Sequence, residues 1–147
     1  MRIGLFIVAA TAGSLFCQPR VHATRSFGSL GPAVLTADQR GNVYVAERDG
    51  VFRMDPAGTR SRIATLKPSA IAADTVGNLY IADSGDNRIW KLAAGIMSVV
   101  AGNGVRGFSG DGGSAIDASL DRPTGVAVDS AGILYIADGT VDGTKDH

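Results

Sequence analysis

Residues 68–83 read PSAIAADTVGNLYIAD, and a related pattern recurs without a gap at residues 32–47 and 123–138. In each copy a proline is followed six residues later by an aspartate, which is Asp38, Asp74 or Asp129. A glycine and then a tyrosine come next, and an alanine with an acid closes the unit. Because one such unit buries its apolar faces only by stacking on a neighbour, this self-similarity predicts a repeat architecture.

Each copy contains short apolar runs joined by turns. Residues 125–129 and 133–137 are β-branched and aromatic runs separated by Ser130-Ala131-Gly132, which predicts a β-hairpin. The run 79–82 is apolar at every position, which is typical of a strand covered on both faces. Further strands are predicted at 88–92 and 96–101 in the second copy, and at 51–54 and 61–66 in the first. Four antiparallel strands per unit are the composition of a propeller blade.

The second copy continues with ADSGDNRI at residues 82–89, and a glycine-rich linker follows at 99–113. With these stretches and the three collinear copies, the chain resembles the NHL repeat family of β-propellers over about residues 31–138. The linker is similar to that of many exported bacterial members. The resemblance implies an all-β partial propeller whose four-stranded antiparallel blades lie at about 31–66, 67–122 and 123–147, the last incomplete. The first copy departs from the pattern at Glu47, where an aspartate is usual.

The number of blades raises a question of closure. Propellers use about four to eight blades, and closing the ring protects the blade edges. A chain with about two and a half blades is therefore expected to belong to a longer gene product or to associate with other copies to complete a ring. A chain that ends within a blade favours the first alternative.

The N-terminus has the features of a secretory leader. Arg2 precedes an apolar run at 3–17, and Val21-His22-Ala23 is a small-x-small site, so residues 1–23 are predicted to be a signal peptide and 24–147 the mature chain. The run is shorter than the roughly 18 to 20 residues of a membrane span. Lipidation of Cys17 is an alternative, although Leu15 and Phe16 are bulkier than that processing favours. The expected location is secreted, periplasmic or at the cell envelope.

Charge and composition exclude several classes of function. Removing Arg2 and Arg20 from 14 basic residues leaves 12 against 14 acids, which argues against binding to nucleic acid or an anionic membrane. Without the leader the chain has no cysteine, and His147 is its only histidine, so a Ser-His-Asp triad, a cysteine nucleophile and a histidine zinc site are not expected. The GxGxxG at 102–107 is followed by more glycine rather than a helix, so no nucleotide is expected. No cofactor or metal is predicted.

Loops at one end of the blades are the predicted binding surface. Antiparallel order places the segments 48–50, 83–88 and 102–122 at a common face, and loops on rigid scaffolds carry recognition. The polar candidates on this face are Asp83, Asp86, Asn87, Arg88, Arg106, Asp111 and Arg122. A purely structural role is the competing interpretation, in which Asp83 accepts hydrogen bonds from turn amides and Arg88 pairs with it.

Two functions fit the sequence. The favoured hypothesis is an exported propeller, or part of one, that binds a protein or glycan without catalysis. The alternative is a fragment of a metal-dependent, gluconolactonase-type propeller enzyme, in which acid and amide side chains hold a metal at the centre of a closed ring. A truncated product without function is a third interpretation.

Overall fold

The computed structural model describes residues 5–11, 20–27 and 34–139, and it divides the chain into two units, Met1–Gly31 and Pro32–His147. In the first unit, β1 (Leu5–Thr11) pairs antiparallel with β2 (Arg20–Phe27), with a register shift between Leu5 and Ile7. These strands fall largely within the predicted leader, whose cleavage stays a prediction. No helix in the described ranges is long and apolar enough to cross a membrane.

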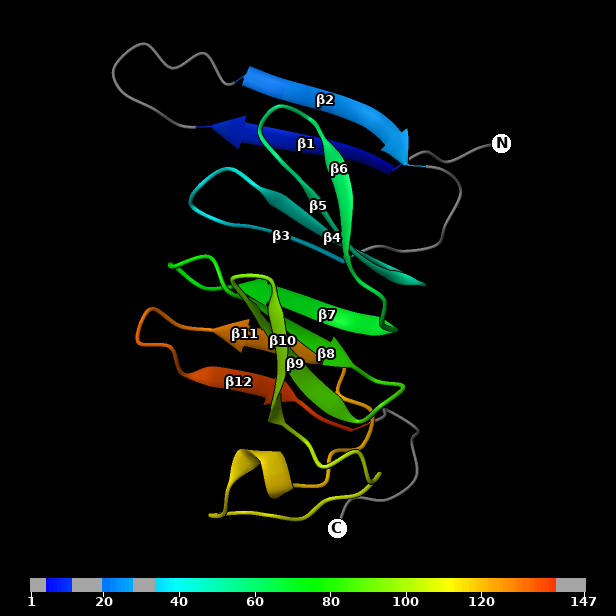
Figure 1. The fold of residues 1–147 in the computed structure, drawn as a ribbon, viewed down its shortest axis with the longest axis vertical. Helices are drawn as coiled ribbons and strands as arrows, with labels where there is room; N and C mark the ends of the chain where they lie inside the picture. The colour runs from blue at the N-terminus through cyan, green and yellow to red at the C-terminus, as the bar shows by residue number, and fades with distance from the viewer. Residues whose placement is uncertain (1–4, 12–19, 28–33, 140–147) are drawn as a thin grey trace. The chain divides into compact units, whose positions relative to one another are not determined.

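The second unit consists of consecutive antiparallel sheets, labelled in Figure 1. Blade 1 has the order β3 (Val34–Ala37), β4 (Val43–Glu47), β5 (Gly50–Met54) and β6 (Arg60–Ala64). Blade 2 contains β7 (Pro68–Ala73), β8 (Leu79–Asp83), β9 (Arg88–Ala93) and β10 (Ile96–Ala101). Blade 3 is described as β11 (Gly125–Val128) and β12 (Leu134–Ala137). A short 3-10 helix, Ala115–Asp117, lies in the loop between blades 2 and 3.

The predicted all-β class is confirmed, since residues 34–139 contain no α-helix. One strand prediction was displaced: the last strand of blade 1 is Arg60–Ala64 rather than residues 61–66. The pairing of β5 with β6 has a register shift between Val51 and Phe52. The last pair of the ladder is Val51 with Ala64, so the strand ends at Ala64. Residues 140–147 of the predicted third blade lie outside the described residues.

The aspartate of each repeat holds the turn between the first two strands. Asp38 Oδ1 accepts hydrogen bonds from the backbone nitrogens of Arg40 and Asn42, both at 2.9 Å. Asp74 and Asp129 make the same pair of bonds to the residues two and four positions later. The glycines Gly41, Gly77 and Gly132 have φ of 82°, 93° and 82°, which explains why each turn uses glycine. The repeated Asp and Gly are therefore parts of the scaffold.

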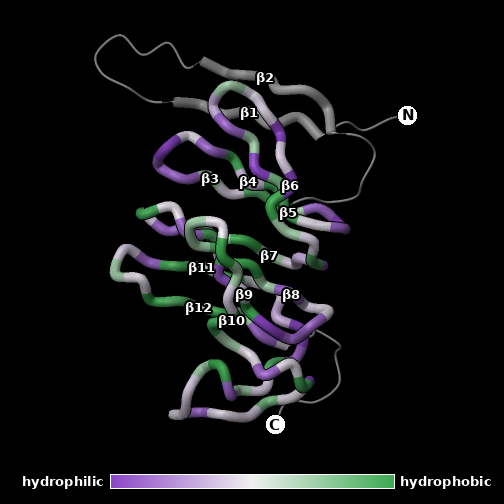
Figure 2. Tube along the Cα trace, viewed as in Figure 1, coloured by the Kyte–Doolittle hydropathy of each residue, from purple (hydrophilic) through white to green (hydrophobic). Residues whose placement is uncertain are grey.

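Two apolar clusters join the blades. One contains Val51 of blade 1 with Ile71 and Ile81 of blade 2, and the other contains Ala82 and Ile89 of blade 2 with blade 3 side chains packed against them. All five residues of β8 are buried, because its alternate side chains enter different clusters. This confirms the prediction of a strand covered on both faces. In Figure 2, β7 and β12 are largely in the hydrophobic colour.

The three repeat tyrosines make equivalent hydrogen bonds in unequal surroundings. Tyr44, Tyr80 and Tyr135 donate through their hydroxyls to Asp38, Asp74 and Asp129 at 3.0, 3.5 and 3.2 Å. Tyr44 and Tyr80 are each 7% exposed, whereas Tyr135 is 55% exposed. Tyr44 belongs to the cluster shared with blade 2, and the described part of the chain places no following sheet over Tyr135. The tyrosine therefore makes the same hydrogen bond in all three copies, but it is buried in the first two and exposed in the third.

Candidate functional site

The structure brings the predicted loops together at one end of the blades. The β4–β5 and β8–β9 connections lie at this end, and the long loop between β10 and β11 bonds to the β8–β9 turn. We call the surface formed by residues 48–50, 83–88 and 102–122 the loop face. Six of the seven predicted side chains make polar contacts there.

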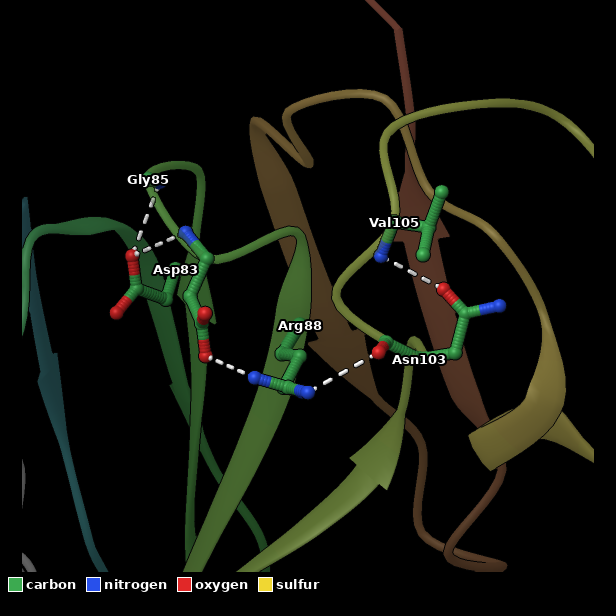
Figure 3. Close-up of polar contacts among 6 residues, drawn as sticks. Asp83, Gly85, Arg88, Asn103 and Val105 are labelled. Atoms are coloured by element: carbon green, nitrogen blue, oxygen red, sulfur yellow. Dashed lines mark hydrogen bonds and ion pairs between the residues drawn. The ribbon is translucent and has the colours of Figure 1, made fainter.

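Asp83 ends β8 and shapes the turn that follows it. Its Oδ1 accepts hydrogen bonds from the backbone nitrogens of Gly85 at 3.0 Å and Asp86 at 3.2 Å (Figure 3). Asp83 is buried, with 5% of its surface exposed. The expected structural role of its carboxylate is therefore observed, and the side chain offers little surface to a ligand.

Arg88 links this turn to the long loop. Its guanidinium forms an ion pair with Asp86 at 2.7 Å and donates to the carbonyl oxygen of Asn103 at 3.0 Å (Figure 3). The expected pairing of Arg88 with Asp83 was wrong, because Asp83 is engaged by the turn amides while Asp86 lies beside the guanidinium. Asn103 in turn accepts a hydrogen bond from the backbone nitrogen of Val105 at 2.8 Å.

Glycines let the long loop approach blade 2 closely. Gly102 has φ of 90°, and a Cβ there would collide with the backbone of Asn87 and lie 2.9 Å from Arg88 Cα. A Cβ on Gly104 would lie 2.6 Å from the Arg88 guanidinium. Gly102 and Gly104 therefore allow close contact between the loop and the β8–β9 turn.

The end of the long loop is held by a second group of polar residues. Asn87 Oδ1 accepts from the backbone nitrogen of Arg122 at 2.9 Å. Arg106 makes two hydrogen bonds to the carboxylate of Asp121, and Arg122 lies 3.6 Å from the same carboxylate. The hydrogen bond from Arg106 holds the pKa of Asp121 below its usual range. Asp111, the seventh predicted residue, is exposed elsewhere on the loop and is not brought into this group.

Two acids in this region were missed at the sequence level. Asp121 is 8% exposed, and its backbone nitrogen donates to Asp138 Oδ1 at 2.8 Å. Burial raises the pKa of Asp138, which is the third-copy equivalent of Asp83. Asp121 corresponds to Leu66 in the preceding repeat, so the repeat pattern gave no signal for it.

A hollow of about 480 Å³ opens on the loop face between blades 1 and 2. Arg48 and Lys67 line it together with the backbone and side chains of the Asp83–Asp86 turn. Lys67 was also missed, although the repeat could have revealed it, since it precedes Pro68 as Arg122 precedes Pro123. Within residues 34–139, no group of three His, Cys, Asp or Glu side chains converges in a way that could hold a metal ion.

The sequence matches the family model of the teneurin NHL domain over residues 10–145. The chain belongs to the teneurin NHL domain family. Human teneurin-1 is 32% identical over 145 residues, and human teneurin-4 is 29% identical over 139 residues. These matches cover 85% and 76% of this chain but only 5% of each teneurin. The predicted membership of the NHL repeat class is confirmed.

Solved structures agree on the fold of this NHL chain. A Bacteroides thetaiotaomicron protein of unknown function superposes with a TM-score of 0.64 at 23% identity, covering 82% of this chain and 37% of that one. A streptogramin B lyase gives a TM-score of 0.57 at 14% identity, and covers 82% of this chain and 38% of its own. A protein provisionally named a gluconolactonase gives 0.53 at 20% identity, with coverages of 82% and 47%. At such identities the likeness concerns the fold alone.

Proposed function

We propose that this chain is part of an exported NHL propeller that binds a protein or glycan through its loop face without catalysis. The observation that carries the proposal is the internal bonding of that face. Asp83 accepts hydrogen bonds from the amides of its turn, and Arg88 joins Asp86 of that turn to Asn103 of the long loop, so the loops are held in place before any partner arrives. Preorganised loops lose less conformational entropy on binding than free ones do.

Exposed apolar side chains on the long loop favour a protein partner over a glycan. Val105, Phe108 and Ile116 are 63%, 73% and 51% exposed. Aromatic and large apolar residues supply much of the binding energy at protein interfaces. The hollow between blades 1 and 2 adds charges of both signs to the loop face, from Arg48 and Lys67 and from Asp49, Asp83 and Asp86.

A display experiment tests the loop face. The labelled chain would be screened against a displayed peptide library and a glycan array, and the selected ligand would be tested against two matched variants. Val105→Glu places a charge on the loop face, whereas Val76→Glu places one on an equally exposed valine in the turn at the other end of the blade. We expect V105E to weaken binding at least about tenfold and V76E to leave it unchanged. Loss of binding in V76E alone, or in neither variant, would refute the proposal.

Calorimetric titration with Ca²⁺ and Zn²⁺ separates binding from metal-dependent catalysis. The proposal expects no stoichiometric micromolar binding of either ion. Such binding, abolished by Asp83→Asn or Asp111→Asn, would instead favour the gluconolactonase-type enzyme.

Export is a separate part of the proposal and has its own test. The intact mass of the protein recovered outside the cytoplasm should correspond to a chain beginning at Thr24. A product that retains residues 1–23 would contradict the predicted cleavage.

A further inference from the structure

A second hollow lies at the opposite end of the blades from the loop face. Its volume is about 370 Å³, and it opens between blades 1 and 2 beside the β3–β4, β7–β8 and β9–β10 turns. The first two of these turns lie at the same left-hand edge of Figure 1. Arg40, Arg53 and Asp38 contribute charged groups to its wall, and the half-buried Ile63 and Leu92 contribute apolar surface. The volume falls within the range of about 300 to 1,000 Å³ that is typical of small-molecule sites.

The two arginines of this hollow are exposed and are not neutralised by an ion pair. Neither guanidinium has a hydrogen-bond or ion-pair partner within residues 34–139. Asp38 is the acid in the same wall, but its carboxylate already accepts four hydrogen bonds. These come from the backbone nitrogens of Arg40 and Asn42, from Asn42 Nδ2 and from the hydroxyl of Tyr44. The Asp38 carboxylate is thus occupied by hydrogen bonds within its own blade, and the guanidinium groups of Arg40 and Arg53 can donate to a ligand.

The repeat shows that Arg40 is not required by the scaffold. Val76 and Ala131 occupy the equivalent position in the second and third copies, and their turns keep the same hydrogen bonds from the aspartate. Arg53 pairs across the ladder with Tyr44, as Lys91 does with Tyr80, so a cation is retained at that position. Blade 1 combines both cations with a hollow against the next blade, whereas blade 2 has Val76 and Lys91 at the same two positions.

We propose that this hollow binds the carboxylate of a small organic anion whose apolar portion lies on Ile63 and Leu92. With two arginines and one aspartate, the wall carries one net positive charge, which suits a single carboxylate. Guanidinium groups bind carboxylates through paired, charge-assisted hydrogen bonds. The apolar surface of the half-buried Ile63 and Leu92 then favours an anion with a hydrophobic body over a bare one. The inference is independent of the proposed function, because the hollow and the loop face lie at opposite ends of the blades.

Calorimetry with four small molecules tests the site. Benzoate carries both required features, acetate lacks the apolar body, benzyl alcohol lacks the charge, and benzylammonium reverses it. We expect measurable binding of benzoate, with acetate and benzyl alcohol each weaker by about tenfold or more and benzylammonium not bound. Equal affinities for benzoate and benzyl alcohol would overturn the proposal.

Three variants locate the binding. Arg40→Gln and Arg53→Gln should each weaken benzoate binding about tenfold, since each removes a charge-assisted contact. Lys91→Gln is the matched control, because it removes the cation at the position equivalent to Arg53 in the next blade, away from the hollow. Circular dichroism would verify that the three variants keep the fold. Unchanged affinity in the doubly substituted R40Q/R53Q chain, or a loss as large in K91Q, would refute the assignment.

Discussion

Replacing Tyr44 by phenylalanine should destabilise the chain by about 1–2 kcal/mol. The ring stays in the cluster between blades 1 and 2, so apolar burial is kept and only the hydroxyl is removed. That hydroxyl donates to the Asp38 carboxylate at 3.0 Å from a side chain that is 7% exposed, so water replaces it poorly. A hydrogen bond to a charged group contributes about 1.5–3 kcal/mol, and partial solvation of the carboxylate reduces that value.

Tyr135→Phe is the matched control, because Tyr135 makes the same bond to Asp129 at 3.2 Å. It is 55% exposed, however, so water can replace the lost donor and the cost should stay below about 0.5 kcal/mol. Urea unfolding at pH 7 measures both free energies. Equal losses for the two variants, or a larger loss for Y135F, would refute the explanation by burial.

The effect of Tyr44→Phe should depend on pH. Burial raises the pKa of Asp38, but hydrogen bonds from Asn42, Tyr44 and Arg40 outweigh it and hold the pKa below 3.8. A carboxylate with a depressed pKa stabilises the fold above its unfolded value and loses this contribution as pH falls through the folded value. The difference between wild type and Y44F should therefore be constant near neutrality and shrink below about pH 3.8.

Three further outcomes are expected. Gly102→Ala should destabilise the chain by more than about 2 kcal/mol, because the new Cβ would collide with the Asn87 backbone. Gly112→Ala should cost about 1 kcal/mol, because Gly112 has a φ of 76° but no atom lies within 4 Å of the new Cβ. Urea unfolding compares the two variants. Asp138→Asn keeps an acceptor for the backbone nitrogen of Asp121 and removes a carboxylate whose pKa is raised by burial. The wild type should lose stability as pH rises from 3.8 through the folded pKa of Asp138, and the variant should not show this loss. An unchanged pH profile in urea unfolding would contradict this. Trp90→Phe should cost less than about 2 kcal/mol in thermal unfolding, because the smaller ring leaves a cavity but removes Trp90 Nε1, which is buried with no partner in the described part of the chain. A larger loss would contradict this.

The scaffold was predictable because its signals are local. Asp74 and Gly77 form the turn, and the apolar run 79–82 is buried on both faces, so each residue's role follows from neighbours within a few positions. The common face of the predicted loops also followed, since antiparallel order alone determines which connections lie at the same end.

The polar contacts of the loop face were less predictable because they depend on the path of a long, glycine-rich loop. The pairing of Arg88 with Asp86 and Asn103, rather than with Asp83, is decided by where residue 103 returns against blade 2. Asp121 has no acidic counterpart in the other copies, so the repeat pattern did not predict its burial or its ion pair with Arg106. Arg40 resembled an ordinary exposed turn residue until the hollow between the blades was visible.

The stacking of the sheets is tested most directly by methyl NOEs. Val51 and Ala46 of blade 1 share a cluster with Ile71 and Ile81 of blade 2, so cross-peaks are expected between these two groups. A second set should connect Ile89 of blade 2 with blade 3, whose Val126, Leu134 and Ile136 pack against its cluster. If every NOE from these methyl groups remained within its own sheet, the sheets would not be stacked as successive blades.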